Sequence, residues 1–309
     1  MKPTVSIIIP TYNRANLLKR AIESILKQDY ENIKEIIITD DGSTDNTKEI
    51  VKEFQERDKR IIFVENTKYK KGPTGNKNNG LDYATGDFVG ILDDDDELLP
   101  DAISKLIDIH LKFGYKHIFA NCLRSDTKEF TGKSYGKSEE VKYEDILCGK
   151  YEGEYWGIVS RDLIGKERFF DDTYGGESLL WWKLYKKTPA FYLNEPIRIY
   201  YVEDEMRVSK KYLKFPERSF LNYKYTLDLY GDDLLKFCPK KFIKICFLAA
   251  FFARIGGKYF KALKYTVFSF KTQELFFLKI FALFLFFLPI PSKILIFLYQ
   301  FFKRFKKIF

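Results

Sequence analysis

The chain has 309 residues, of which 46% are hydrophobic and 31% are charged, so it can bury a substantial core and is not intrinsically disordered. Its formal net charge of +9 is unevenly distributed, because residues 240–309 hold fourteen Lys or Arg and one acid, Glu274. The rest of the chain is slightly acidic, so the basic character belongs to the tail alone. No nucleic-acid partner is expected. Two histidines and four scattered cysteines argue against a histidine-based triad, a histidine-rich metal centre and a structural zinc site, and they suit a reduced compartment.

Strand and helix patterns alternate over the first hundred residues. No N-terminal signal peptide is expected, because residues 1–4 lead straight into a β-branched run. Strands are predicted at residues 5–10, 35–39, 61–64 and 88–92, and helices at 15–28, 45–57 and 75–84. This alternation predicts a parallel sheet with right-handed crossovers.

The pattern is looser after residue 100. Helices are predicted at residues 101–113, 179–187 and 216–230, and strands at 117–123, 155–160 and 197–202, the last at the sheet edge. Residues 125–155 are polar and allow no firm assignment. Gly231, the two aspartates that follow it and Pro239 are expected to separate the body from the tail.

Five consecutive acids, from Asp93 to Glu97, follow the apolar strand predicted at residues 88–92. Carboxylates this close raise one another's pKa unless a cation lies among them. Hard divalent cations take oxygen ligands, and open α/β folds bind ligands at the carboxyl ends of their strands. A solvated acidic loop and a helix N-terminus are the alternatives.

Four segments follow one another in a recognisable order. They are V-S-I-I-I-P-T-Y-N-R at residues 5–14, D-D-G-S at 40–43, G-P-T…K-N-N-G-L at 72–81 and L-D-D-D-D…P at 92–100. The set resembles family 2 of the nucleotide-sugar glycosyltransferases, tightly over residues 4–101 and more weakly to about residue 205. The resemblance implies an α/β fold of the GT-A class, with a Rossmann-like, mostly parallel sheet flanked by helices.

The resemblance gives the acid run a register. It implies that Asp95 binds a metal ion directly, Mn²⁺ or Mg²⁺, with Asp93 in the same site, and that Asp94 faces the ribose or the metal's surroundings. The ion would bridge the two phosphates of the nucleotide and stabilise the departing diphosphate. We interpret Asp96 and Glu97 as charge at a helix N-terminus.

The other segments are expected to bind the nucleotide. By the resemblance, Asp41 accepts the imide N–H of uracil; the alternative is an Asp-Gly turn with a helix cap at Thr44. Pro10 and Tyr12 would flank the base, or simply pack at the end of a strand. Lys77 would hold the nucleotide or its phosphates, although a solvated helix lysine is the alternative.

The acceptor side is expected to supply a base. Glu177 is the candidate, because residues 175–182 resemble the family's G-E-D…W segment, although Ser178 stands where the family commonly has Asp. An ordinary helix-capping glutamate is the alternative. The resemblance also implies that Arg207 lies in a loop over the diphosphate. The processive Q-x-x-R-W motif is absent, so a single-addition enzyme is expected.

Two domains are expected: a glycosyltransferase domain at residues 1–235, with a nucleotide half (1–101) and an acceptor half (102–235), and a basic, aromatic-rich helical region at 236–309. No apolar stretch of the tail reaches the ~18–20 residues of a membrane span. Aromatic and aliphatic faces with interleaved lysines indicate helices lying on anionic lipid. A re-entrant hairpin at residues 289–291, a true span and a buried helical core are alternatives, and the lysines disfavour the last.

These expectations define a function. The sequence predicts an inverting, metal-dependent hexosyltransferase that moves a sugar from a nucleoside-diphosphate donor, expected to be UDP-linked, to a lipid-linked or cell-surface glycan. It would act at the cytoplasmic face of the cell membrane as a peripheral or monotopic protein. Because Ser178 departs from the family pattern, a membrane protein that binds nucleotide sugar without catalysis is the alternative.

Overall fold

The computed structural model describes residues 2–133, 135–202, 212–276, 279, 280, 282, 286 and 290–304. The chain divides into two compact units. The first comprises residues 1–171 and 180–205, and the second comprises residues 172–179 and 206–309. The domain boundary expected at residue 235 stays a prediction.

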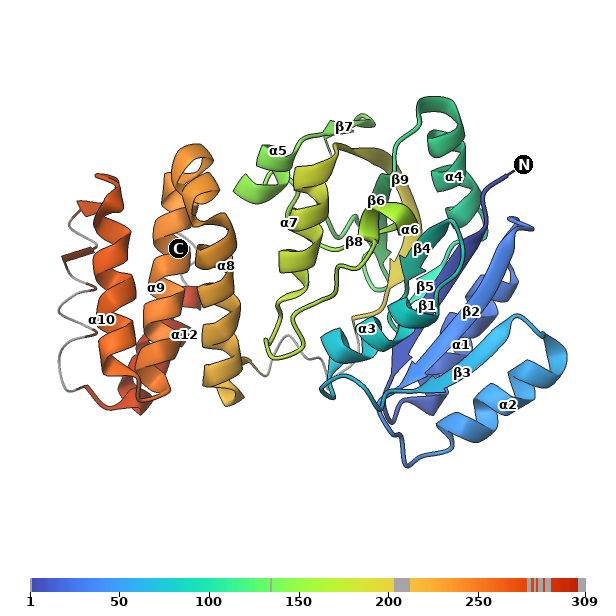
Figure 1. Ribbon diagram of the computed structural model, residues 1–309, viewed down its shortest axis with the longest axis horizontal. Coiled ribbons are helices and arrows are strands. Elements are labelled where there is room, and N and C mark those ends of the chain that lie inside the picture. The colour runs from blue at the N-terminus through green and yellow to red at the C-terminus, as the bar shows by residue number, and fades with distance from the viewer. Residues whose placement is uncertain are drawn as a thin grey trace. The chain divides into compact units, whose positions relative to one another are not determined.

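The first unit is an α/β sandwich (Figure 1). Its strands are β1 (Val5–Thr11), β2 (Ile33–Asp40), β3 (Ile61–Glu65), β4 (Phe88–Ile91), β5 (Glu97–Leu98), β6 (His117–Arg124), β7 (Glu139–Val141), β8 (Tyr155–Ser160) and β9 (Ala190–Tyr200). Its helices are α1 (Ala15–Leu26), α2 (Thr47–Arg57), α3 (Pro73–Tyr83), α4 (Ala102–Phe113), α5 (Tyr143–Cys148), α6 (Arg161–Ile164) and most of α7 (Glu177–Lys187).

The sheet runs in the order β3-β2-β1-β4-β8-β6-β9-β5, with β7 paired to β9. Strands β3, β2, β1 and β4 are mutually parallel, as predicted. Strand β8 is antiparallel to both of its neighbours, β4 and β6, so the sheet is mixed. Because the chain order reverses around β1, a crevice is expected outside the carboxyl ends of β1 and β4.

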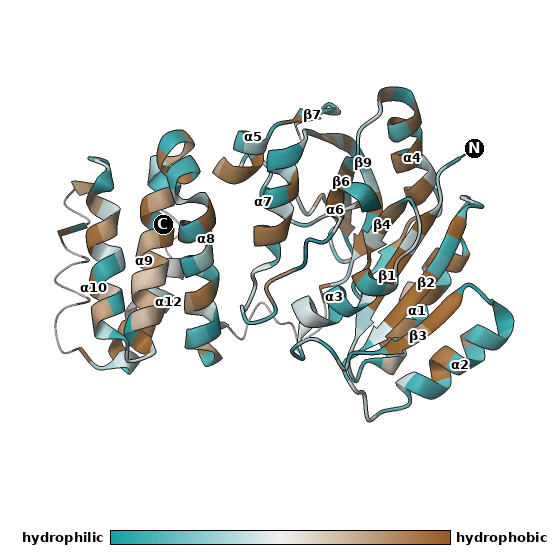
Figure 2. Ribbon diagram, viewed as in Figure 1, coloured by the Kyte–Doolittle hydropathy of each residue, from teal (hydrophilic) through white to brown (hydrophobic). Residues whose placement is uncertain are grey.

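Alternating side chains of the strands pack against helices on both faces of the sheet. On one face, Ile7 and Ile9 of β1 pack in a core with α1, α2 and α4. On the other, Ile8 packs with residues of α3, α6 and α7. Figure 2 shows the apolar strands and the polar outer side of α2. Strands buried on both faces explain the continuous β-branched runs in the sequence.

The predicted elements of the first hundred residues are confirmed, with ends shifted by a few residues. Four short elements of the first unit were not predicted: β5, β7, α5 and α6, of which β7 and α5 lie in the stretch left unassigned. The predicted edge strand is wrong in extent and place. Strand β9 begins at Ala190 and pairs in parallel with β6 from Phe191 to Tyr200. It also pairs antiparallel with β5 and β7, so it lies inside the sheet and β5 lies beyond it.

The second unit is helical. Its elements are η2 (Tyr212–Lys214), α8 (Pro216–Phe237), α9 (Pro239–Ile255), α10 (Tyr259–Phe268), η3 (Ser269–Lys271) and α12 (Ser292–Arg304). Gly231 does not end a helix as expected: α8 continues through it to Phe237, and Pro239 begins α9. A lone glycine lowers helix propensity by only about 1 kcal/mol, which packing against α9 offsets.

Much of the tail's apolar surface is buried within this unit. Phe242 and Phe252 of α9 are nearly inaccessible. Two basic side chains are buried as well: Lys279 donates to the Thr272 carbonyl, and Arg254 donates to the Ile290 carbonyl at 2.8 Å. The expectation that lysines disfavour a buried helical core is therefore wrong for this part of the tail, because backbone carbonyls satisfy the buried cations. Within the described residues, every helix is too short or too polar to cross a bilayer.

Candidate active site

Three parallel strands end at one edge of the sheet, and each is followed by a predicted site segment. Thr11 ends β1, Asp40 ends β2, and the acid run follows β4. Thr11 pairs with Asp40 in the register of β1 and β2, and the Leu92 N–H continues the β1–β4 ladder by donating to the Ile8 carbonyl at 2.9 Å. The parallel register brings together side chains that are far apart in sequence, such as Thr11 and Asp94, which are separated by 83 positions.

The acid run alternates between exposed and buried side chains. The side chains of Asp93 and Asp95 are 48% and 17% exposed, whereas those of Asp94 and Asp96 are 3% and 2% exposed. The two aspartates predicted to bind metal are thus the two that solvent reaches. Asp94 pairs with Arg14, and Asp96 pairs with Arg198. The expected place of Asp94 facing the ribose or the metal's surroundings stays a prediction.

Protein cations lie among these carboxylates. Arg14 spans two of them, with Nη1 2.6 Å from Asp94 and Nη2 2.9 Å from Asp95. Lys77 of α3 lies 3.1 Å from the Asp93 carboxylate. Crowded carboxylates were expected to need positive charge at this place, and the fold supplies part of it from α3 and the turn before α1.

Burial and charge act in opposite directions on these groups. Burial raises the pKa of Asp94 to about 7, although Arg14 and the Thr11 hydroxyl favour its ionised form. Burial likewise raises the pKa of Asp96 to about 7, against the pull of Arg198. Burial alone would also raise the pKa of Asp93, but the charges of Lys77 and Arg198 hold it below its ordinary value.

The interpretation of Asp96 and Glu97 as helix N-terminal charge is wrong. Asp96 is buried and pairs with Arg198 of β9 at 2.9 Å. Glu97 belongs to β5, which pairs antiparallel with β9, and helix α4 begins only at Ala102. Arg198 was missed because a single arginine between two isoleucines in a predicted strand suggests a solvent-facing position. The only sequence signal for Arg198 was indirect: five consecutive acids need cationic partners from elsewhere in the chain.

Lys77 is not a solvated helix lysine. It is 8% exposed, and α3 lies close against the sheet because position 80 is a glycine: a Cβ there would lie 2.3 Å from the Ile8 side chain. Asn76, which was not singled out from the sequence, fastens the same helix by donating to the Thr11 and Thr39 carbonyls at 3.0 and 2.9 Å.

The residues expected around the base lie at the ends of β1 and β2. Pro10 is buried within β1, opposite Thr39, whereas Tyr12 just beyond the strand is 53% exposed. Asp41 is buried, and its two oxygens accept hydrogen bonds from Asn66 Nδ2 at 2.8 Å and from the Gly72 N–H at 2.6 Å. Burial raises the pKa of Asp41. Each carboxylate oxygen has two lone pairs, so Asp41 can accept a further hydrogen bond beside these two. Its recognition of uracil stays a prediction.

The alternative of a Thr44 helix cap is wrong. The Thr44 N–H donates instead to the Asn13 side chain at 2.7 Å, and Asp45 accepts the Thr47 N–H where α2 begins. Asn13 has a φ of 52° and also donates its N–H to the Ser43 hydroxyl at 2.8 Å. This left-handed turn joins the two loops and places Arg14 beside the acid run.

Two predicted site residues lie elsewhere in the chain. Glu177 is the first residue of α7, is partly buried and belongs to the second unit together with Ser178. Its role as a base stays a prediction. Arg207 lies outside the described residues.

No set of three or more carboxylate, histidine or cysteine side chains in the described part of the chain is arranged to hold a metal by itself. Asp93 and Asp95 nevertheless fit a hard divalent ion, because Mg²⁺ takes one or two carboxylates when substrate phosphates complete its coordination.

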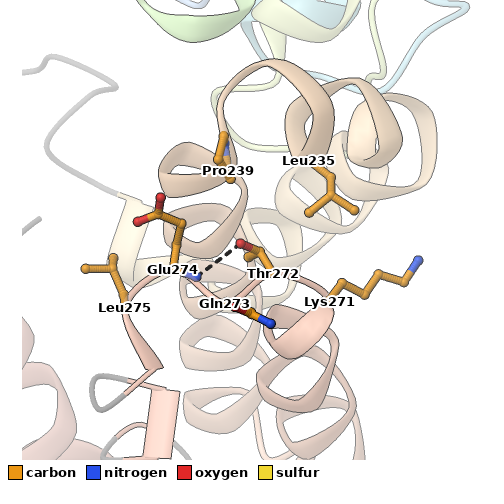
Figure 3. Close-up of a pocket in the computed structure, with 7 residues that line it drawn as sticks. All are labelled: Leu235, Pro239, Lys271, Thr272, Gln273, Glu274 and Leu275. Atoms are coloured by element: carbon orange, nitrogen blue, oxygen red, sulfur yellow. Dashed lines mark hydrogen bonds between the residues drawn. The ribbon is translucent and has the colours of Figure 1, made fainter.

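A separate hollow of about 600 Å³ lies in the second unit (Figure 3), lined by Leu235, Pro239, Lys271, Thr272, Gln273, Glu274 and Leu275. It contains no predicted site residue.

The profile described as "Glycosyl transferase family 2" matches residues 6–175. The chain belongs to this family. It is therefore a glycosyltransferase, and the motifs that carried the resemblance lie within the match. A Campylobacter jejuni GalNAc(5)-diNAcBac-PP-undecaprenol beta-1,3-glucosyltransferase is 40% identical over 265 residues, which are 83% of this chain and 85% of that protein.

A second relative has a similar name. The Escherichia coli UDP-Glc:alpha-D-GlcNAc-diphosphoundecaprenol beta-1,3-glucosyltransferase is 35% identical over 53% of this chain and 63% of its own length. Among solved structures, Staphylococcus aureus TarS residues 1–349 superpose with a TM-score of 0.64 at 15% identity, covering 92% of this chain and 89% of that one. The same TarS residues in complex with UDP-GlcNAc give a TM-score of 0.61 at 18% identity, over 81% and 72%. At this identity the likeness concerns the fold alone, which is GT-A.

Proposed function

We propose that this chain transfers glucose from UDP-glucose to a glycan carried on undecaprenyl diphosphate. The names of the two bacterial relatives both describe beta-1,3-glucosyltransferases with undecaprenol-linked acceptors. The observation that carries the proposal is the alternation of the acid run, which leaves Asp93 and Asp95 open to solvent beside Lys77. A nucleoside diphosphate and its metal ion need such a pair of carboxylates with a cation next to it.

Each residue of this edge has a role in the proposed reaction. Asp93 and Asp95 would hold Mn²⁺ or Mg²⁺, which when bound neutralises the charge that grows on the leaving diphosphate. Lys77 adds a positive charge for the same phosphate oxygens. Tyr12 offers an exposed ring on which uracil can stack. Pro10, near the end of β1, would flank the base on its other side, and Asp41 would accept the imide N–H.

The acceptor must lose a proton as its oxygen attacks the anomeric carbon with inversion. Glu177 is the carboxylate proposed to take that proton, because the neighbouring Ser178 cannot act as a base at neutral pH. Arg207 is proposed to contact the diphosphate. The absence of the processive motif supports transfer of one sugar per acceptor.

The experiment is a transfer assay with purified full-length protein. UDP-glucose, UDP-galactose and UDP-N-acetylglucosamine are each offered with Mn²⁺ or Mg²⁺ and a polyprenyl-diphosphate acceptor carrying N-acetylglucosamine or N-acetylgalactosamine, and products are identified by mass. We expect transfer from UDP-glucose. We expect Asp95→Asn to lower the rate at least about 100-fold, because the lost ligand contributes several kcal/mol of charge stabilisation.

Controls separate chemistry from folding. Asp58→Asn removes a carboxylate that pairs with Arg60 on a surface loop, and it should leave transfer unchanged. Glu177→Gln should bind UDP-glucose but turn over slowly. Transfer that survives Asp95→Asn contradicts the metal assignment, and a wild type that binds nucleotide sugar without turnover supports the inactive-protein alternative.

We also propose that the second unit rests on an anionic lipid surface at the cytoplasmic face of the membrane. Several of its large apolar side chains remain exposed, among them Phe260 at 90% and Phe297 at 63%. Helix α12 buries Leu295 while Ile294 and Phe297 face outward, so it has an apolar outer face. Interleaved lysines would contact the lipid headgroups.

Liposome flotation tests this attachment. The double variant Phe260→Ser, Phe297→Ser should lose most binding to vesicles containing phosphatidylglycerol, whereas Leu111→Ser, a comparable change at an exposed site of α4, should not. Point variants are preferable to removing the tail, because α9 packs on α8 and truncation would expose their shared core. Unchanged flotation of the double variant would refute the lipid assignment.

A further inference from the structure

Arg14 makes a forked contact with the acid run. It follows Asn13, whose positive φ turns the chain, and it precedes the first residue of α1. Its Nη1 lies 2.6 Å from Asp94 and its Nη2 lies 2.9 Å from Asp95. A planar guanidinium can serve two acceptors at once, which a lysine ammonium does with less geometric precision.

The two ends of this fork differ. Asp94 is buried, and its second oxygen accepts the Thr11 hydroxyl at 2.7 Å, so the Arg14–Asp94 end is held from both sides. Asp95 is 17% exposed, and it is one of the two carboxylates assigned to the metal ion. Nη1 is therefore held on the buried Asp94, whereas Nη2 contacts Asp95, a carboxylate that the metal ion would also bind.

Charge sets these two uses of Asp95 against each other. A divalent cation on Asp95 places two positive charges beside the Arg14 guanidinium, which weakens the Arg14–Asp95 contact. The same event delivers diphosphate oxygens to this edge. A guanidinium nitrogen released from a carboxylate finds in a phosphate oxygen an acceptor of equal strength.

We propose that Arg14 is an exchangeable counterion: in the nucleotide-free protein it holds Asp95, and on binding of the metal–nucleotide complex its Nη2 passes to a diphosphate oxygen while Nη1 stays on Asp94. The inference rests on the proposed function, because it takes the metal and the UDP moiety as ligands. It assigns Arg14 two opposite effects, competition with the free ion and attraction of the diphosphate.

Those opposite effects can be measured without turnover. In full-length Arg14→Gln, Mn²⁺ binding to the protein alone, followed by electron paramagnetic resonance, should tighten several-fold because a competing cation is gone. UDP binding in the presence of saturating Mn²⁺, followed by calorimetry, should weaken about tenfold because a charge-assisted hydrogen bond is lost. Arg14→Lys should fall between the wild type and Arg14→Gln in both assays.

Arg60→Gln is the matched control. Arg60 also makes a two-nitrogen contact with one aspartate, Asp58, but on a surface loop, so both dissociation constants should stay within about twofold of wild type. If Arg14→Gln weakens the binding of both Mn²⁺ and UDP, Arg14 is only structural. If it changes neither dissociation constant, Arg14 has no role in binding. Either result overturns the inference while leaving the proposed function intact. A wild type that binds neither Mn²⁺ nor UDP overturns both.

Discussion

Lys77 Nζ lies 3.1 Å from the Asp93 carboxylate, although one residue is on α3 and the other follows β4. The contact depends on how closely α3 approaches β1. It places a positive charge next to an aspartate that is half exposed, at the edge where a nucleoside diphosphate is proposed to bind. Lys77 is therefore better placed to serve a phosphate than to stabilise the fold.

This position leads to the first prediction. Lys77→Gln should raise the dissociation constant for UDP about tenfold in the presence of Mn²⁺, because a charged donor to phosphate is lost. The free energy of unfolding should change by less than about 1 kcal/mol, because water can solvate the exposed Asp93 carboxylate. Calorimetry and denaturant unfolding measure the two quantities. Lys68→Gln, at the exposed pair with Asp82, is the control; equal losses in both variants would refute the phosphate role.

The second prediction concerns the packing that places Lys77. Gly80→Ala should destabilise the protein by about 1–3 kcal/mol, because the added Cβ would lie 2.3 Å from the Ile8 side chain. The same change at Gly231, inside α8, meets no atom within 4 Å and should be neutral or stabilising by up to about 1 kcal/mol. Thermal unfolding of both variants tests the pair. A stable Gly80→Ala variant with unaltered UDP binding would show that α3 can shift without consequence.

A third prediction follows from the buried pair of Arg198 and Asp96. Arg198→Met should destabilise the fold by about 3–5 kcal/mol, because Asp96 would remain buried without its cation. Adding Asp96→Asn should recover a large part of that loss, since the uncompensated charge is removed. Urea unfolding of the wild type, both single variants and the double variant completes the cycle. Strict additivity of the two single effects would mean that the residues do not interact.

The fourth prediction is a pH dependence of stability. His117 is buried against the ring of Tyr185, and burial lowers its pKa to about 3. Below the ordinary pKa of about 6.5 the unfolded chain binds a proton that the folded chain does not, so stability falls as the pH falls. Between about pH 6 and pH 4 the wild type should lose roughly 1.4 kcal/mol per pH unit more than His117→Leu does. Parallel slopes in urea titrations of the two proteins would contradict the buried, neutral histidine.

Local patterns were enough to predict most of the first unit. Runs such as residues 5–10 and 35–39 became buried parallel strands, because β-branched stretches flanked by helical repeats have few other ways to bury both faces. The order of the strand-end motifs likewise placed Tyr12, Asp41 and the acid run at one edge of the sheet. These features depend on periodicity and chain order, and both can be read along the sequence.

Only the tertiary structure decided which acids are exposed and which cations accompany them. The partners of the acid run come from the turn before α1, from α3 and from β9, and Arg198 is about a hundred residues away in sequence. Composition indicated that the tail is basic and apolar, but packing decided that Lys279 and Arg254 are buried. Ion pairs and burial depend on strand register and helix placement, because charges interact through space, and no pattern of neighbouring residues records which distant side chain will lie within hydrogen-bonding distance.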